Sequence, residues 1–174
     1  PEGAGARRLE GDGRRMRRGQ NLCGAAFWAV RERVGERMLL AIDVGNTQTV
    51  VGVYEGKKLS HRWRVATNKH HTCDELRVKL IPLLNSEGLS FQDIGGMCLA
   101  SVVPALTDAW CTAAKQMLGH RAVVCSAETA GDLFDASGYP NPREIGADRV
   151  ADAVAARELF GAPVIVVDFG TATN

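Results

Sequence analysis

The fold of this 174-residue chain is indicated most clearly by the stretch Leu39-Leu40-Ala41-Ile42-Asp43-Val44-Gly45-Asn46-Thr47-Gln48-Thr49-Val50-Val51-Gly52-Val53. Two apolar runs rich in β-branched residues flank a short polar turn, a pattern typical of two buried strands joined by a tight reversal. Gly45 permits the reversal and the close approach of a ligand, and Asp43 ends the first strand in a position to hold a cation. The turn is a candidate phosphate and metal site, and an ordinary buried β-turn is the alternative.

The same order of residues occurs a second time, in Val164-Ile165-Val166-Val167-Asp168-Phe169-Gly170-Thr171-Ala172-Thr173. Asp168 aligns with Asp43, and Gly170 aligns with Gly45. Two such turns in one chain predict a duplicated fold, in which each half brings a phosphate-binding hairpin to a shared cleft.

Composition indicates a soluble globular protein, with 45% hydrophobic and 24% charged residues. No apolar run approaches the roughly 18 residues that span a membrane, and no signal peptide is evident. Residues 1–37 contain nine Arg against five acids, whereas residues 38–174 contain twelve Lys or Arg against fifteen acids. The mildly acidic main part disfavours nucleic acid as a partner. Five scattered cysteines without a Cys-x-x-Cys pattern indicate neither zinc nor a disulfide framework, which agrees with a reducing cytoplasm.

Residues 1–37 are predicted to be a disordered basic extension, or upstream sequence translated from an early start, with Met38 as the natural beginning. The alternative is a basic arm for nucleic acid or an acidic membrane surface. The chain stops at Asn174, directly after an expected strand and turn, which predicts a truncated protein or an incomplete gene model.

The rest of the chain reads as an α/β pattern with a mixed sheet. A capping box at Thr72 and Glu75 predicts the start of a helix, in which Pro82 is expected to cause a kink or an early end. Pro104 and Gly119 bound a second helix. Strands are expected at residues 38–44, 47–54, 57–66, 94–100, 122–125 and 163–168.

A further polar cluster lies between a loop rich in Pro and Gly and a helical apolar stripe that ends at Gly161. Asp148 and Arg149 fall in the first turn of that helix. A capped surface helix with a local ion pair between Arg149 and Asp152 is the alternative to a functional role.

Three motifs taken together resemble the type III pantothenate kinases, of the acetate/sugar kinase, Hsp70 and actin superfamily. They are Asp43-Val44-Gly45-Asn46-Thr47, Pro142-Arg143-Glu144-Ile145-Gly146-Ala147-Asp148-Arg149 and Val167-Asp168-Phe169-Gly170-Thr171-Ala172-Thr173. The resemblance covers residues 38–174 and implies an actin-like (ribonuclease H-like) ATPase fold. Residues 38–145 would form the first lobe, and residues 146–174 a linking helix and the first strand of a truncated second lobe.

The resemblance implies ATP-dependent phosphorylation of pantothenate to 4′-phosphopantothenate, the first step of coenzyme A biosynthesis. It also implies Mg²⁺, a monovalent cation (K⁺ or NH₄⁺), a homodimer and a cytoplasmic location. The alternatives are a regulatory protein of the same fold, like the Bvg accessory factor group, and another small-molecule kinase of the superfamily.

The resemblance also assigns residue roles. ATP phosphates would be bound by hairpin residues of both halves, namely Asp43, Val44, Gly45, Asn46, Thr47, Gln48, Thr49, Val50, Gly170 and Thr171. Pantothenate would be held by Tyr139, Gly146, Ala147, Asp148 and Arg149. Asp148 would accept the hydroxyl proton, Asp43 would lie near Mg²⁺, and Asp168 would bind the monovalent cation. Arg149 offers a planar fork that suits a carboxylate.

Overall fold

The computed structural model describes residues 37–168, so the predictions for residues 1–36, Gly170 and Thr171 lie outside the described part. A five-stranded sheet with the order β3-β2-β1-β4-β5 forms its centre. The strands are β1 (Met38–Val44), β2 (Gln48–Glu55), β3 (Lys58–Ala66), β4 (Ile94–Ser101) and β5 (Val123–Val124). The helices are α2 (Cys73–Asn85), α3 (Pro104–Leu118), α4 (Ala127–Ala130) and α5 (Ala147–Phe160), with 3₁₀ turns η1 (Gly131–Leu133) and η2 (Pro142–Glu144).

The sheet is mixed, as the sequence predicts. Strands β1, β2 and β3 pair antiparallel, because short turns join them. Strand β4 pairs parallel to β1, and β5 pairs parallel to β4. Longer connections that contain α2 and α3 precede β4 and β5, as parallel pairing requires. The α/β class is therefore confirmed.

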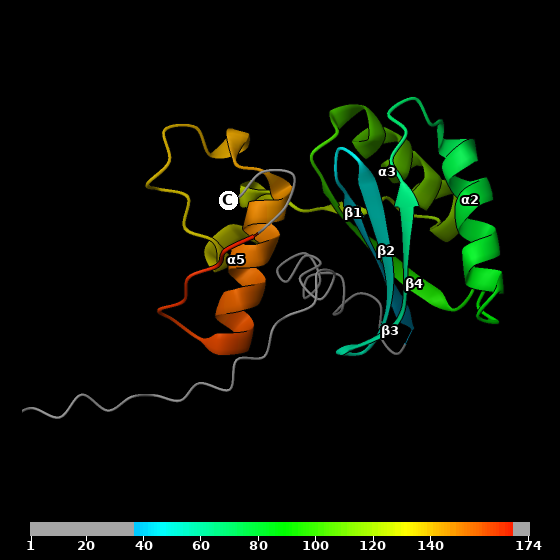
Figure 1. Ribbon diagram of the computed structural model, residues 1–174, viewed down its shortest axis with the longest axis horizontal. Coiled ribbons are helices and arrows are strands. Elements are labelled where there is room, and N and C mark those ends of the chain that lie inside the picture. Colours follow the sequence, from blue (N-terminus) through cyan, green and yellow to red (C-terminus); the bar gives the residue numbers. More distant parts are fainter. Residues whose placement is uncertain (1–36, 169–174) are drawn as a thin grey trace, which may run out of the picture.

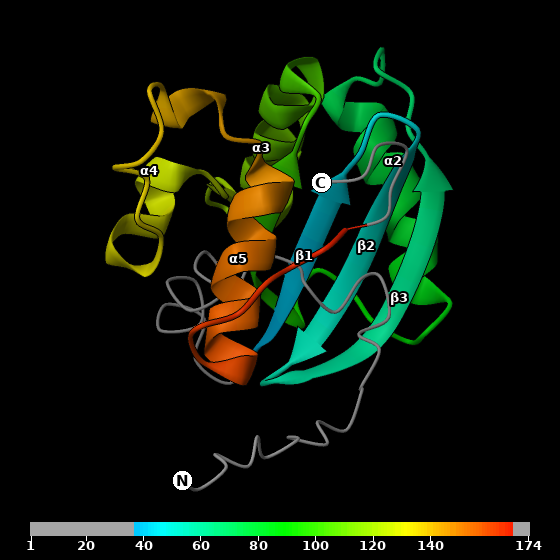
Figure 2. The same ribbon diagram turned by 60° about the vertical axis from the view of Figure 1, so that its left-hand side comes forward.

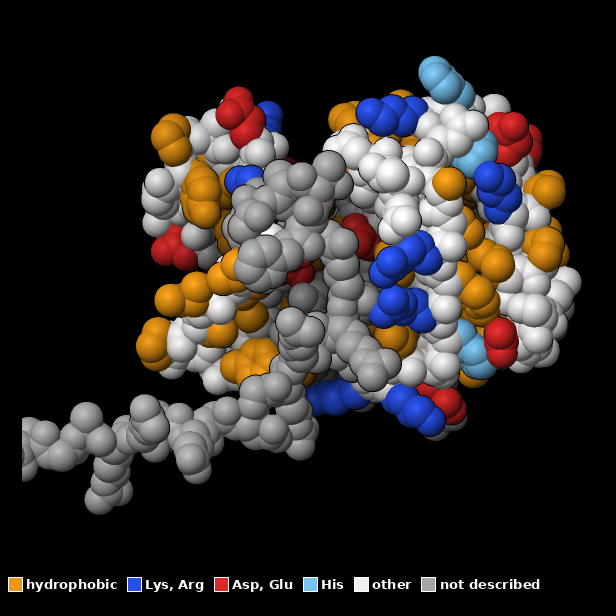
Figure 3. Space-filling view, in the orientation of Figure 1, with side chains coloured by type: hydrophobic (Ala, Val, Ile, Leu, Met, Phe, Trp, Pro, Cys, Tyr) orange, Lys and Arg blue, Asp and Glu red, His pale blue; other side chains and the backbone are white. Residues whose placement is uncertain are grey.

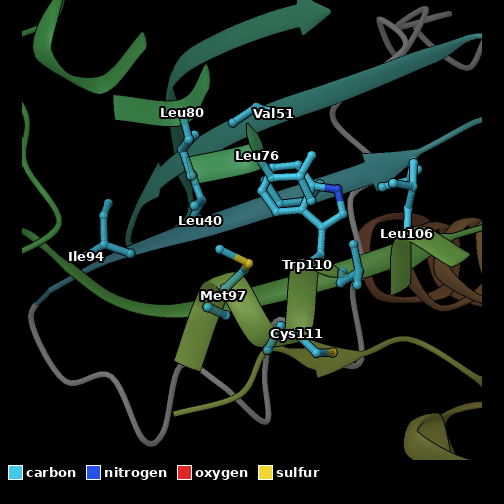
Figure 4. Close-up of a cluster of buried hydrophobic side chains, with 14 of the residues drawn as sticks. Leu40, Val51, Leu76, Leu80, Ile94, Met97, Leu106, Trp110 and Cys111 are labelled. Carbon is cyan, nitrogen blue, oxygen red and sulfur yellow. The ribbon is translucent and has the colours of Figure 1, made fainter. Parts of the chain in front are cut away.

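Helices cover both faces of the sheet, and Figure 1 shows the three layers with α5 on one side and α2 and α3 on the other. Alternate residues of a strand point to opposite faces. Leu40 and Ile42 of β1 belong to the cluster that packs under α2 and α3, which Figure 4 shows around Trp110. Leu39 and Ala41 belong to the cluster that packs against α5. Burial on both faces explains the nearly continuous apolar run of β1.

Helix α5 runs antiparallel to β1, so that its first turn lies at the end of the sheet where β1 ends (Figure 2). Its apolar stripe contains Val150, Ala151 and Val154, all of which belong to the same buried cluster as Leu39 and Ala41. Buried side chains of α5 therefore join this helix to the sheet. The lobe boundary between residues 145 and 146 stays a prediction.

Local sequence signals set the helix ends. The Thr72 hydroxyl accepts from the Glu75 amide, and the Glu75 carboxylate accepts from the Thr72 amide, which confirms the capping box. Gly119 adopts φ 80° at the end of α3, a conformation that favours glycine. The early end predicted at Pro82 is wrong, because α2 continues to Asn85. Pro82 and Val78 are both exposed, so solvent is available to the carbonyl that the proline leaves without a partner.

The strand predicted at residues 163–168 is not formed. Figure 2 shows this segment rising from the end of α5 toward the edge of the sheet where β1 ends. Ile165 is 90% exposed, and no strand of the described residues pairs with the segment. An apolar run becomes a strand only where a neighbour completes the hydrogen-bond ladder. The strand expected at residues 122–125 is confirmed, although only Val123–Val124 carry the pairing.

Among residues 37–168, no helix combines the length and the apolar character needed to cross a membrane.

Candidate functional site

The turn between β1 and β2 presents a short exposed loop at the edge of the sheet. The Gly45 amide donates to the Gln48 carbonyl at 3.0 Å, and the Thr67 amide donates to the Thr47 carbonyl at 2.9 Å. A Cβ atom at Gly45 would lie 3.0 Å from the Gln48 oxygen, a contact that side chains rarely tolerate. Asn46, Thr47 and Gln48 are exposed, so their polar groups face solvent and are accessible to a ligand.

The next two residues of β2 point to opposite faces of the sheet. Thr49 pairs with Val44 and is only 4% exposed, and its hydroxyl lies 2.8 Å from the Thr67 hydroxyl. Val50 pairs with Asp43 and points to the α5 face. The predicted phosphate-binding residues therefore include an exposed loop and a buried threonine, whose hydroxyl is hydrogen-bonded to the Thr67 hydroxyl.

Asp43 lies half-buried near the end of β1, on the face that α5 covers. Its partner in β4 is Ala100, which belongs to the buried cluster under α5. In open α/β sheets, ligands bind beyond the carboxyl ends of the strands, where chain connections leave in opposite directions. Strand β1 lies at such a point, because the chain continues to β2 on one side and returns as β4 on the other.

The first turn of α5 holds Asp148 in a defined position. Gly146 is the N-cap residue and makes no side-chain cap. The Asp148 Oδ1 atom instead accepts from the Arg149 amide at 2.9 Å. A Cβ atom at residue 146 would clash with this oxygen, so the glycine leaves room for the carboxylate. A negative charge at this place is also favoured by the helix N-terminus.

A chain of contacts brings this helix turn to the same edge of the sheet as Asp43. The Cys125 thiol approaches the Ala147 carbonyl at 3.6 Å, and the Cys125 amide donates to the Leu99 carbonyl at 2.8 Å. Leu99 adjoins Ala100, the β4 partner of Asp43. Asp43 and the first turn of α5 therefore lie at the same end of the strands and on the same face of the sheet.

A hollow of about 190 Å³ opens beside this turn of α5. Its walls come from the loop before the helix and from the helix itself, and the lining residues are Tyr139, Pro140, Asn141, Glu144, Ile145 and Arg149. Tyr139 and Arg149, which the sequence predicts as ligand-binding residues, therefore line one hollow. The Tyr139 ring also lies 6.4 Å from the Phe134 ring, which anchors it to the buried cluster below.

Two polar residues of this hollow, Asn141 and Glu144, were not predicted from the sequence. The side-chain amide of Asn141 donates to Glu144 Oε1 at 2.7 Å, and Asn141 Oδ1 accepts from the Arg143 backbone amide at 3.3 Å. Asn141 thereby caps η2 and fixes the Glu144 carboxylate at the wall. The Asn-Pro dipeptide at 141 and 142 is a turn signal that points to such a cap.

Earlier in the same loop, Asp135 accepts a hydrogen bond from the Ser137 amide at 2.9 Å. Hydrogen bonds from the Ser137 side chain and backbone lower the pKa of Asp135. The turn that leads to Tyr139 is thus held by a carboxylate in its charged form.

A second hollow lies on the opposite face of the sheet, between β2, β3, α2 and α3. It measures about 20 Å³, and apolar side chains such as Leu80 and Trp110 dominate its lining. That space suits one water molecule rather than a metabolite. The hollow at Tyr139 and Arg149 is therefore the better candidate site.

The second predicted hairpin is described only in part. Asp168 is half-buried and is the last described residue, and it makes at least one interaction with another residue. Gly170 and Thr171 lie outside the described residues. Among residues 37–168, no group of three or more His, Cys, Asp or Glu side chains is arranged as a metal site.

The arrangement suits two ligands at one edge of the sheet. The exposed hairpin offers amide, hydroxyl and carboxamide groups for an anion. The hollow offers a guanidinium for a carboxylate and a phenol for packing and hydrogen bonding. Asp148 directly precedes Arg149 in the chain, but neither it nor Gly146 nor Ala147 is among the residues that line the hollow. A carboxylate of this kind can accept a hydrogen bond from a ligand hydroxyl.

Comparisons with known proteins show the family of the chain. The sequence model of one family, type III pantothenate kinase, matches residues 39–174. Curated type III pantothenate kinases from Moorella thermoacetica and Halalkalibacterium halodurans are 46% and 45% identical over 137 residues, which cover 79% of this chain and 53% of theirs. One from Geobacillus kaustophilus is 43% identical over 139 residues, covering 79% of this chain and 52% of its own. The chain thus spans about half the length of the curated relatives it matches.

Solved structures give more distant similarities. A PilM-PilN type IV pilus biogenesis complex matches with a TM-score of 0.49 and 14% identity over 77% of this chain and 50% of that one. The ethanolamine utilization protein EutJ from Carboxydothermus hydrogenoformans gives a TM-score of 0.40 and 12% identity over 75% and 53%. No function follows from similarities of this size.

Proposed function

The chain belongs to the type III pantothenate kinase family, and from this premise we propose that the protein phosphorylates pantothenate with ATP. The product would be 4′-phosphopantothenate, which places the protein in coenzyme A biosynthesis. The observation that carries the proposal is the hollow beside the first turn of α5, which Tyr139 and Arg149 line together, while the Arg149 amide donates to the Asp148 carboxylate.

In this proposal pantothenate occupies that hollow. Its carboxylate would pair with the planar guanidinium of Arg149, which can donate two parallel hydrogen bonds to the two carboxylate oxygens. Tyr139, which is 50% exposed, would pack against the ligand. The backbone of Gly146 and Ala147 would line the approach to Asp148.

Asp148 would act on the pantothenate hydroxyl. The hydroxyl oxygen attacks the γ-phosphorus, the bond to the β–γ bridging oxygen breaks, and the hydroxyl proton passes to an Asp148 oxygen. In a loose transition state this proton leaves late, so a weak base that mainly orients the hydroxyl suffices. The hydrogen bond from the Arg149 amide at 2.9 Å holds the carboxylate for this task.

ATP would place its phosphate groups at the β1–β2 turn. Asn46, Thr47 and Gln48 are exposed there, and Gly45 allows the close approach of a phosphate to the backbone. Phosphoryl transfer depends mainly on positioned donors and cations, and this loop would supply hydrogen-bond donors. Thr49 would act through its bond to Thr67, by fixing the strand beneath the loop.

The cations of the proposal are Mg²⁺ and a monovalent ion. Mg²⁺ is commonly bound by one or two carboxylates together with substrate phosphates, and the half-buried Asp43 beside the loop fits that donor set. When bound, Mg²⁺ would neutralise charge on the phosphates. We assign the monovalent cation, K⁺ or NH₄⁺, to Asp168, on the sequence resemblance.

A homodimer and a cytoplasmic location complete the proposal. Tyr139 and Arg149 are exposed on the open side of the hollow, and a second subunit would close it. The widely spaced cysteines are typical of a reducing compartment.

The test is the transfer reaction itself. The protein is incubated with Mg²⁺-ATP, K⁺ and pantothenate, and both ADP and 4′-phosphopantothenate are measured, the latter by mass spectrometry. We expect pantothenate-dependent ADP and an equal amount of phosphorylated product. ADP formation with glycerol or acetate but not with pantothenate would contradict the proposal. The chain spans half the length of its relatives, so binding is measured apart from turnover. Calorimetry with ATP and with pantothenate gives the affinity for each substrate.

A further inference from the structure

Two arginines of the edge strand β3 lie on the same face of the sheet as Asp43. Trp63 packs against the cluster under α2 and α3, and Val65 lines the small hollow on that side. Because side chains alternate along a strand, Arg62 and Arg64 point to the opposite face, which is the face of Asp43 and α5. Both arginines are exposed.

The environment of Tyr54 supports this orientation independently. Tyr54 belongs to the cluster under α5, and burial raises the pKa of its phenol to about 12. Positive charge from Arg62 counteracts part of this rise, so the guanidinium acts on the α5 face. Figure 3 shows blue Lys and Arg side chains gathered over β2 and β3.

The register of the sheet places Arg64 in line with the β1–β2 turn. Arg64 pairs with Val50, and Val50 pairs with Asp43, so the three residues form one row across the strands. Two strand spacings separate the ends of this row, about 10 Å between Cα atoms. Within the described residues 37–168, no carboxylate forms an ion pair with Arg64.

The hollow at Tyr139 is too far from Arg64 for one anion to contact both. The hollow at Tyr139 is lined by Arg149 of α5, and Ala147 in the same helix turn contacts Cys125, the residue after β5, whereas β3 is the other edge strand. Four strand spacings between these edges amount to roughly 19 Å. An anion that Arg64 contacts therefore lies near the turn, and a carboxylate in the hollow is too distant.

We propose that Arg62 and Arg64 form a cationic wall that binds the phosphate groups of the nucleotide from the side of β3. Arg64 lies level with Asp43, and Arg62 lies one row further from the turn, opposite Gly52. Guanidinium groups bind phosphate oxygens with paired, charge-assisted hydrogen bonds. This inference rests on the proposed ATP-dependent function and adds two binding residues to it.

Arg64→Gln tests the assignment through ligand binding. Removing one charge-assisted hydrogen bond to a phosphate lowers the affinity for that ligand by about ten- to a hundredfold. We expect Arg64→Gln to weaken Mg²⁺-ATP and inorganic tripolyphosphate by this factor in calorimetry. Adenosine, which has no phosphate, should bind the variant and the wild type equally, and Arg64→Lys should recover part of the affinity for ATP.

Lys58→Gln is the matched control, because it removes one positive charge from the same strand. Lys58 is exposed and lies six residues before Arg64, about 20 Å along the strand. The control variant should bind ATP as the wild type does. An equal loss in Lys58→Gln would mean that only net charge matters, and would overturn the assignment.

Two further results would overturn it. One is unchanged ATP affinity in both Arg62→Gln and Arg64→Gln, and the other is weakened binding of pantothenate with ATP binding unaffected. The proposed function fails separately, when the wild-type protein itself binds ATP and pantothenate but transfers no phosphate. A thermal melt of each variant shows whether the fold is retained, which we expect for substitutions at exposed positions.

Discussion

Asp148 is the proposed proton acceptor, and the structure shows how its carboxylate is held. Its carboxylate lies over a glycine and accepts the hydrogen bond of the next backbone amide, so helix geometry and not a neighbouring side chain sets its direction. Asp148→Asn keeps the shape and removes the proton acceptor. We expect turnover to fall by about a hundredfold or more, with pantothenate binding within a few-fold of wild type.

Glu158→Gln provides the control for Asp148→Asn. It neutralises an exposed carboxylate at the other end of the same helix, away from the hollow. The control should leave turnover and the KM for pantothenate unchanged. Near-full turnover in Asp148→Asn would rule out its role as proton acceptor.

Tyr54 gives a prediction about stability at alkaline pH. Burial raises its pKa from 10.0 to about 12 in the folded protein. Above pH 10 the unfolded chain loses the phenol proton while the folded protein keeps it, so the free energy of unfolding falls as pH rises toward 12. The loss is on the order of 2 kcal/mol, given about 1.4 kcal/mol for each pKa unit.

Comparison with Tyr54→Phe isolates this contribution. Urea unfolding at pH 8, 10 and 11.5 should show the wild type losing more stability than the phenylalanine variant, because other titrating groups affect both equally. Parallel pH profiles would show that the phenol ionises alike in the folded and unfolded states.

At the scale of single residues, the sequence predicts which residue types the site uses but not which way they point. Thr49 illustrates the difference, because its hydroxyl follows a glycine turn yet lies on the buried face and contacts Thr67. Asn141 and Glu144 were missed because their role depends on a loop conformation that brings two side chains within 2.7 Å. Arg62 and Arg64 could be placed only once the strand register was known.

At the scale of elements, the packing of α5 against the sheet decides whether Asp148 and Asp43 share an edge. Val150 is fully buried in the cluster between α5 and the sheet. Val150→Ala removes two methyl groups there and should lower the free energy of unfolding by roughly 1–3 kcal/mol. Urea unfolding measures the change.

Val78→Ala is the same substitution at a helix position that is 67% exposed, on α2. It should change stability by less than about 0.5 kcal/mol. Equal losses in the two variants would contradict the tight packing of α5 on the sheet.

Elements with local signals were predictable from the sequence. The capping box at Thr72 and the left-handed Gly119 depend on neighbouring residues alone, so the sequence specifies them. The first three strands were predictable because short turns join them in register. Residues 163–168 carry an equally strong apolar pattern, but a strand also requires a partner, which no local pattern supplies.

At the scale of the whole molecule, three groups of residues lie side by side at the end of the sheet where β1 ends. From β3 to β5 these are the arginine pair, the exposed β1–β2 turn with Asp43, and the hollow at the first turn of α5. In the proposal, this order would put the bound phosphates between the arginines of β3 and the acceptor hydroxyl. A phosphoryl-transfer enzyme needs this sequence of groups, because donor and acceptor must meet in line.

A crystal structure of the protein with a non-hydrolysable ATP analogue and pantothenate tests this account most directly. We predict the triphosphate at Gly45–Gln48, with the pantothenate carboxylate at Arg149 and its hydroxyl facing Asp148. Either ligand bound away from this edge of the sheet, such as on the face of α2 and α3, would contradict it.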